Sequence, residues 1–173
     1  MDSLLRSQLS QTIDTKSLQQ KLPSYVRVVT YDALSKQAPK TLKEAMGKQT
    51  VLILLFNVHS KQHMTLNVPG HFFVISVRGP EPCVVFSSTG MTPKKELFIT
   101  HSDPALLTRI LPKSTIYNNV KFQISRDSNT CWRWNILFAR LATLGLKKFQ
   151  TLFKRPVTIH NPDLLAVAFT FLL

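Results

Sequence analysis

"TVLILLFNV", residues 50–58, is an apolar run that opens on one threonine and is interrupted only by one asparagine. A strand with water on one face alternates apolar and polar residues, whereas a continuous apolar run is typical of a strand buried on both faces. We therefore expect this stretch to lie inside a β-sheet that is packed by helices.

Two further apolar stretches predict strands that pair with each other. "HFFVISVR" (71–78) and "CVVFSS" (83–88) are separated by a short segment that contains Pro80 and Pro82. This arrangement is typical of antiparallel strands joined by a tight turn. Shorter strand signals lie at residues 25–31 and 115–124.

Helical spacing and helix start signals fill much of the remaining chain. They predict helices at 2–21, at 42–46, from Asp103 with Pro104 as the first helical residue, at 130–144, shortly after Gly145, and from Asn161 onward. Helical and strand segments alternate without repeats, and 173 residues suit one domain. We expect a single α+β domain across residues 1–173, with a central mixed β-sheet.

The charge of the chain is strongly positive. Lys and Arg number 22 against nine acids, for a formal net charge of +13. Such a charge indicates a polyanionic partner, above all nucleic acid bound through its phosphates; a generally basic surface is the alternative. Between Asp127 and Asp163 there is no acid, and this stretch carries Arg133, Arg140, Lys147, Lys148, Lys154 and Arg155.

Other features of the composition limit the class of protein. Two cysteines, Cys83 and Cys131, make no disulfide framework, so we expect a reducing compartment. The apolar tail at 164–173 is too short to span a bilayer, and we expect no membrane partner. His59 and His63 have no carboxylate or cysteine beside them, so we expect no metal site.

Cys131 follows a polar segment, "SNT" (128–130), and opens an apolar helical run. If one of these polar residues caps the helix, Cys131 lies in the first turn. The helix dipole and the free N–H groups there favour a thiolate and can stabilise an oxyanion. The alternative is a small core residue without a chemical role.

Two other polar residues suit the chemistry of a reactive thiol. His71 opens a strand after "VPG" (68–70), and a strand end can hold an imidazole rigidly as a general base. Gln123 lies eight positions before Cys131, where its amide can donate to an oxyanion. Each also has a structural alternative, as a hydrogen-bonded histidine at a sheet edge and an exposed strand-end glutamine.

The order of these motifs resembles a known family. "GHF" (70–72), "FSSTG" (86–90), Gln123 and "SNTC" (128–131) follow one another as in the adenain family, named for the adenovirus maturation protease, with relatives in virophages and large virus-like transposons. The ubiquitin-like-modifier proteases are more distantly similar. The resemblance covers roughly residues 50–145 and implies an α+β cysteine protease fold with the nucleophile at the start of a central helix. It implies Cys131 as nucleophile, His71 as base and Gln123 as oxyanion donor.

The chain departs from the family pattern at two positions. Ser87 stands where the family has a residue, usually Asp, that orients the imidazole, and Trp132 stands where the cysteine is normally followed by Gly. A serine can accept a hydrogen bond but cannot stabilise an imidazolium by charge. We expect Ser87, or a group near it, to contact the His71 nitrogen that faces away from Cys131, and Ser87→Asp to maintain or raise activity.

The resemblance also implies a biological setting. It suggests a viral maturation cysteine endopeptidase that cleaves capsid or core precursor proteins after small residues such as Gly, in the virion and the infected cell. No cofactor is then required, although DNA is implied as a polyanionic cofactor on the basic residues. One alternative is a protease of ubiquitin-like modifiers. The other is a basic nucleic-acid-binding virion protein on a degenerate protease fold, and the serine at position 87 favours this second alternative.

Overall fold

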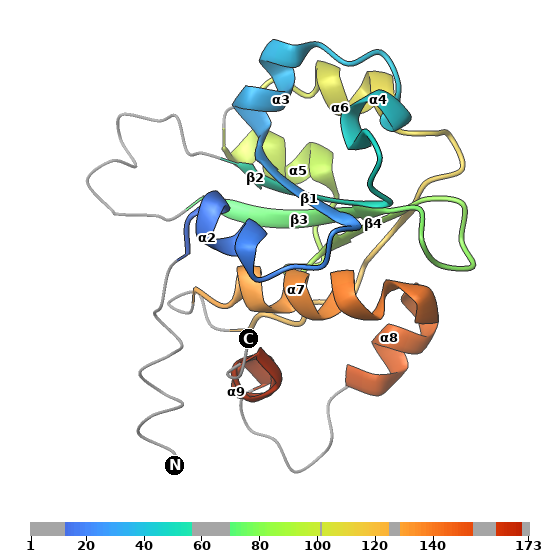
Figure 1. Ribbon diagram of the computed structural model, residues 1–173. Helices are drawn as coiled ribbons and strands as arrows, with labels where there is room; N and C mark the ends of the chain where they lie inside the picture. The colour runs from blue at the N-terminus through green and yellow to red at the C-terminus, as the bar shows by residue number, and fades with distance from the viewer. Residues whose placement is uncertain (1–12, 57–69, 101, 125–128, 154–161, 171–173) are drawn as a thin grey trace.

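A five-stranded mixed sheet forms the centre of the molecule (Figure 1). The computed structural model describes residues 13–56, 70–100, 102–124, 129–153 and 162–170. The strands run in the order β1 (Val26–Thr30), β2 (Val51–Phe56), β3 (His71–Ser76), β4 (Val84–Ser87) and β5 (Ile116–Tyr117). β3 pairs antiparallel with β2 and β4, whereas the outer pairs β1–β2 and β4–β5 are parallel.

Helices cover both faces of this sheet (Figure 1). One face carries α3 (Tyr31–Gln37), α4 (Leu42–Met46), α5 (Pro93–Ile99) and α6 (Ala105–Ile110). The other carries α2 (Thr15–Gln20), α7 (Cys131–Leu141), α8 (Leu146–Phe153) and α9 (Pro162–Thr170), with a 3-10 turn at Ala142–Leu144. The fold is therefore a three-layer α/β/α arrangement.

β2 shows why a continuous apolar run was required. Val51 and Ile53 face the core under α7, whereas Leu52, Leu54 and Phe56 face the core under α3 to α6. All five side chains are fully buried, because successive residues of a strand point to opposite faces. The sequence-based expectation of a strand buried on both faces is confirmed.

α7 is the central helix of its layer. It packs mainly on β3, and every residue from Cys131 to Ala139 is buried between the sheet and the outer helices. Phe138 stacks on Phe86 of β4, with ring centroids 4.5 Å apart. These first turns of the helix are thus buried around their whole circumference and hold Cys131 rigidly.

Several boundaries differ from the sequence-based expectations. Tyr31 begins α3, so the predicted strand at 25–31 is shorter, and neither α3 nor α5 was predicted. The strand expected at 115–124 has only two paired residues. Much of the helix expected at 2–21 lies outside the described residues. Within the described part of the chain, no helix has the length and apolar character needed to cross a membrane.

Candidate active site

His71 is the first residue of β3, and its backbone is fixed by the glycine before it. Phe56 of β2 pairs with His71, and a Cβ added at Gly70 would lie 2.1 Å from the Phe56 carbonyl oxygen. Only glycine tolerates this approach of one backbone to another. The β4 ladder begins at the Phe73–Ser87 pair, so His71 projects just beyond the end of β4.

Cys131 is the first residue of α7 and is 7% exposed. Thr130, one of the three candidates from the sequence, occupies the N-cap position, but its hydroxyl makes no capping bond to the helix. It donates instead to Oδ1 of Asp163 on α9, at 2.7 Å. The start of α7 is therefore held by tertiary contact rather than by a local cap, and Cys131 lies in the first turn as the sequence indicates.

The thiol of Cys131 lies beside the imidazole of His71, and a hydrogen bond between them contributes to the pKa of the histidine. Burial by itself would lower the pKa of His71, but the negative charge of Glu96 and the hydrogen bond with Cys131 raise it to about 10. The imidazolium form is thus favoured at neutral pH. The sequence-based expectation that these two residues share one site holds in the structure.

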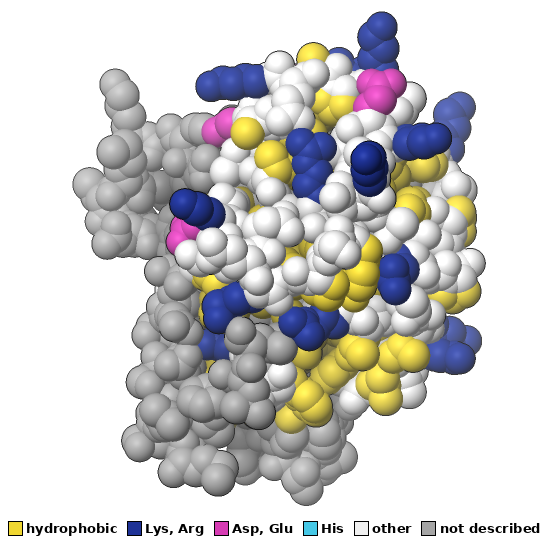
Figure 2. All heavy atoms as spheres, in the orientation of Figure 1, with side chains coloured by type: hydrophobic (Ala, Val, Ile, Leu, Met, Phe, Trp, Pro, Cys, Tyr) yellow, Lys and Arg dark blue, Asp and Glu magenta, His cyan; other side chains and the backbone are white. Residues whose placement is uncertain are grey.

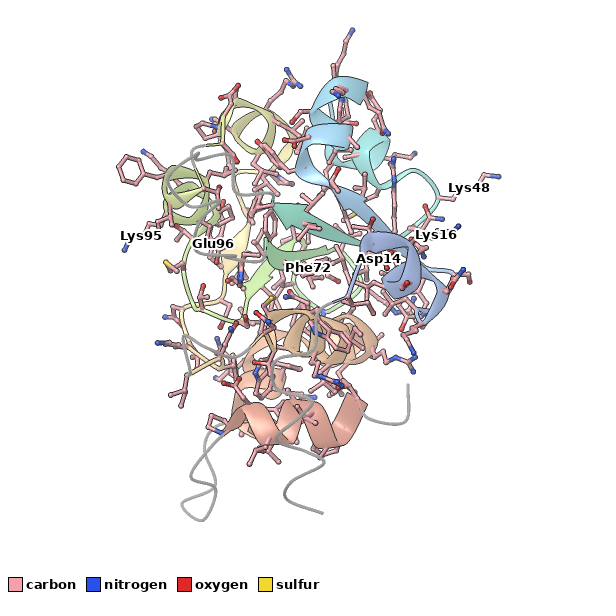
Figure 3. The ribbon with its side chains drawn as sticks, turned by 90° about the vertical axis from the view of Figure 1, so that its left-hand side faces the viewer. Asp14, Lys16, Lys48, Phe72, Lys95 and Glu96 are labelled. Atoms are coloured by element: carbon pink, nitrogen blue, oxygen red, sulfur yellow. The ribbon has the colours of Figure 1, made fainter. Side chains whose placement is uncertain are left out.

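Glu96 of α5 supplies the carboxylate that the sequence motif lacks. Its Oε1 lies 3.3 Å from Nε2 of His71, and the side chain is 3% exposed. Figure 3 shows Glu96 on the side of α5 that faces the sheet, with Lys95 on the outer side. Because Nε2 faces Glu96, Nδ1 is the ring nitrogen that we assign to Cys131.

Two hydroxyl groups also donate hydrogen bonds to this carboxylate. Ser87 and Thr89 both donate to Oε1 of Glu96, Thr89 at 2.7 Å. Each hydroxyl has one proton, so both oxygens are then left as acceptors. The Ser87 oxygen lies 3.1 Å from Nε2 of His71 and can accept from its N–H. One imidazole N–H and two O–H groups thus converge on a single carboxylate oxygen.

Ser87 therefore contacts the expected nitrogen of His71, but it is not the only group that does so. The family pattern places the orienting residue at position 87, where this chain has an uncharged serine. The negative charge beside His71 comes instead from Glu96, nine residues later. The sequence does contain a pattern that marks Glu96 as a buried acid. Pro93, Glu96, Leu97 and Thr100 have helical spacing and form the buried side of α5, so one acid stands in an otherwise uncharged stripe.

Gln123 is brought to the same end of β4. Its backbone N–H donates to the Ser88 carbonyl at 2.9 Å, and its side-chain Oε1 accepts from the Ser88 hydroxyl at 3.0 Å. Ser88 follows Ser87 directly, so Gln123 is anchored one residue from the group that contacts His71. The Gln123 side chain is therefore fixed by Ser88 at this end of β4.

Asp163 of α9 holds the segments on either side of this region. Its carboxylate accepts from Thr130 at 2.7 Å, from the Trp134 indole at 3.0 Å and from the backbone N–H of Ile124 at 3.3 Å. Ile124 follows Gln123, and Thr130 precedes Cys131. Asp163 is fully buried, and sequence reasoning did not identify it.

The basic residues that were grouped from the sequence are divided by the structure. Arg133 is 2% exposed, donates to the Thr170 hydroxyl at 2.8 Å and packs on the Trp132 ring, so it is unavailable to a phosphate. Its grouping with the residues expected to bind DNA was therefore wrong, because it lies close to the start of α7, where α9 packs against the helix. Burial lowers the pKa of Arg133 to about 10.

The remaining members of that group are partly exposed and partly outside the described residues. Arg140, Lys147 and Lys148 are exposed, and Arg140 donates to the Lys21 carbonyl at 2.9 Å. Lys154 and Arg155 lie outside the described residues. Figure 2 shows one face of the molecule, where Lys and Arg side chains are widely spread and Asp and Glu are few.

The second cysteine has a different environment. Cys83 is fully buried in the core that lies under α3 to α6, and burial raises the pKa of its thiol. Among the residues that the structure describes, no group of three or more His, Cys, Asp and Glu side chains is placed to hold a metal ion. Cys131, His71 and Glu96 are therefore the candidate catalytic residues among those that the structure describes.

Comparison with family models, with curated proteins and with solved structures gives no match for this chain.

Proposed function

We propose that the protein is a cysteine endopeptidase in which Cys131 is the nucleophile, His71 the acid and base, and Glu96 the residue that orients His71. The observation that carries this proposal is the convergence of the three side chains from α7, β3 and α5 with a raised pKa of His71. A histidine with a perturbed pKa, placed between a nucleophile and an orienting carboxylate, is typical of catalytic sites.

The first half of the proposed reaction forms an acyl-enzyme on Cys131. His71 takes the proton of the Cys131 thiol, and the sulfur attacks the peptide carbonyl as a thiolate. The tetrahedral oxyanion is stabilised by N–H groups at the start of α7 and by the Gln123 amide. His71 then donates its proton to the leaving nitrogen, the amine departs, and a thioester remains on Cys131.

The second half of the reaction regenerates the site. Neutral His71 takes a proton from water, and the resulting hydroxide attacks the thioester carbon. Collapse of this second intermediate breaks the carbon–sulfur bond and releases the new carboxyl terminus, with the thiolate and imidazolium restored. The Glu96 carboxylate stabilises the imidazolium whenever it forms.

Glu96 also bears on the alternative of a degenerate protease fold. That alternative depended on the missing acid at Ser87, and a carboxylate 3.3 Å from the imidazole weakens it. A buried carboxylate beside a histidine costs free energy of desolvation unless it is compensated, which supports a functional reason for its presence.

We extend the proposal to the substrate by the resemblance to the adenain family. The substrates are then capsid or core precursors, cleaved after small residues such as Gly in the virion and infected cell. Phe72 matches the aromatic position that narrows the cleft in that family, although its side chain is 4% exposed and packs in the core. The exposed basic residues, Lys147 and Lys148 among them, serve to tether the enzyme along packaged DNA.

The test is cleavage of a proteome-derived peptide library, with new termini identified by mass spectrometry. We expect the wild type to cleave after small residues, and Cys131→Ala and His71→Ala to be inactive with unchanged circular dichroism. A ubiquitin-like probe is included, and reaction with it alone would redirect the proposal to modifier proteases. Equal cleavage by Cys131→Ala would refute it.

A further inference from the structure

Asn135 is a buried amide in the middle of α7, the central helix of its layer. It is fully buried, and its neighbours along the chain are Trp134 and Ile136, which are also fully buried. A polar side chain in such a place costs free energy unless hydrogen bonds satisfy it. The contacts of Asn135 therefore indicate what the chain gains from it.

The amide nitrogen of Asn135 links two backbone segments of the active site. Nδ2 donates to the Cys131 carbonyl at 2.6 Å and to the Phe72 carbonyl at 2.8 Å. Cys131 carries the proposed nucleophile, and Phe72 directly follows the proposed base, His71. One NH2 group has two protons, and both are used in these two bonds.

The position of Asn135 in α7 explains how it reaches both. It lies four residues after Cys131, so the two side chains share one face of the helix, the face that packs on β3. The β4 ladder pairs with β3 from Phe73 onward, and Phe72 lies one residue beyond it. The Asn135 amide thus contacts β3 where the neighbouring strand has ended.

The other end of the amide argues against a purely stabilising role. Among the described residues, no hydrogen-bond partner reaches Oδ1 of Asn135, and this atom is buried. An apolar residue of similar size would avoid this cost to the folded state. A residue that is costly for stability and lies between the nucleophile and the strand of the base points to a functional requirement.

We propose that Asn135 is a positioning residue that fixes the separation of Cys131 and His71 by tying the start of α7 to β3. The inference depends on the proposed function, since it assumes that the thiolate–imidazolium pair is the working state. Without Asn135, α7 is free to shift along β3 by a fraction of an ångström. The pair then weakens, and Cys131 reverts to an ordinary thiol.

The experiment measures the rate of Cys131 alkylation by iodoacetamide from pH 5 to pH 10 in the full-length protein, read by mass spectrometry. The variants are Asn135→Leu, which removes the donor at similar volume, and Asn135→Ser, whose hydroxyl can still bond the Cys131 carbonyl one turn back but is too short for Phe72. The control is Ile136→Ala, which damages the same helix without touching either carbonyl.

We expect both Asn135 variants to lose the reactivity of Cys131 at acidic pH, by about tenfold or more at pH 6, while rates near pH 10 stay similar. Ile136→Ala should keep the wild-type profile despite a lower melting temperature. If Asn135→Leu does not fold, Asn135→Ser alone provides the test.

Two outcomes would overturn different parts of the account. Wild-type acid reactivity that persists in the Asn135 variants would contradict the positioning role and leave the proposed function standing. A wild type without any acid reactivity at Cys131 would contradict the proposed function itself. Loss of acid reactivity in Ile136→Ala as well would show that any weakening of α7 suffices, and would also refute a specific role for Asn135.

Discussion

Replacing Glu96 by glutamine removes a charge from the site while leaving the side-chain shape almost unchanged. The Oε1 atom of a glutamine can still accept from Ser87, from Thr89 and from Nε2 of His71, the three donors that converge on Oε1 of Glu96. The substitution therefore separates the effect of the charge from the effect of the hydrogen bonds.

The expected size of the effect follows from the geometry. Two opposite charges 3.3 Å apart attract by roughly 5 kcal/mol at an effective dielectric constant of about 20. In the wild type burial is the largest single influence on His71 and lowers its pKa, but this attraction, the hydrogen bond with Glu96 and the interactions with Cys131 together outweigh burial and raise the pKa from 6.5 to about 10. In Glu96→Gln, burial opposes the charge on His71 with only Cys131 and one hydrogen bond to a neutral amide to compensate, and we expect its pKa to fall to about 6.5 or below. The rate of peptide cleavage should then fall on the order of 10²- to 10⁴-fold.

The assay is an NMR titration of the imidazole, with the His71 signal assigned from its loss in His71→Gln. Glu44→Gln is the control, because Glu44 is exposed and only accepts from the backbone N–H of Lys40. An unchanged, raised pKa of His71 in Glu96→Gln, or full activity of that variant, would refute the role of Glu96.

The same raised pKa predicts how stability depends on pH. A histidine whose pKa is higher in the folded state adds stability that is fully present below its unfolded value of 6.5 and is lost as pH rises toward about 10. Urea unfolding should therefore show a decline in the free energy of unfolding across this range in the wild type. The decline should be largely absent in His71→Gln.

Three further substitutions test other parts of the structure. Ser87→Asp should lower activity, contrary to the expectation from sequence, because a second carboxylate would lie against Glu96 in a buried site; peptide turnover measures this. Asp163→Asn should lower the free energy of unfolding by about 1–3 kcal/mol in urea, since an amide cannot accept at every contact that the carboxylate makes. Reversing Lys147 and Lys148 to Glu should reduce the slope of log affinity for duplex DNA against log salt by roughly 1.8, at 0.9 per phosphate contact.

Each of these predictions has a control or a contrary outcome. Ser87→Ala keeps the single carboxylate and should lose less activity than Ser87→Asp; the opposite order would contradict the account of Glu96. An Asp163→Asn variant as stable as the wild type would show that the contacts of α9 are dispensable. Reversal of Lys36 and Lys43, on the opposite helical layer, should leave the salt slope unchanged if the DNA lies along α8.

The layers of the fold and the burial of β2 follow from the sequence because their signal is local. The continuous apolar run of β2 predicts burial on both faces, and the helix at 42–46 has the bounds that were expected. β3 and β4 pair antiparallel as their turn residues indicate. Cys131 and His71 were identified by the chemistry of a helix start and a strand end, and the fold brings them together.

Glu96 could not be placed from sequence, because its role depends on tertiary packing. Thr92 followed by Pro93 is a helix start signal that would have revealed α5, and Glu96 would then have stood on its buried side. That this side meets Ser87 and His71 depends on how α5 crosses the sheet, which no local pattern encodes. The same holds for Asp163 and Asn135. Trp134, a partner of Asp163, lies 29 residues away from it, and Phe72, the partner of Asn135 on the sheet, lies 63 residues away.

The relative reactivity of the two cysteines tests the central claim most directly. Wild-type protein is treated with iodoacetamide at pH 6, and the alkylation rates of Cys131 and Cys83 are followed separately by mass spectrometry. An imidazolium-paired thiol in the first turn of α7 should be alkylated at a rate that stays high at this pH and drops when His71 is replaced by Gln, whereas Cys83, buried and with a raised thiol pKa, should scarcely react. A Cys131 that reacts no faster than Cys83, or no faster than it does in His71→Gln, would contradict the account.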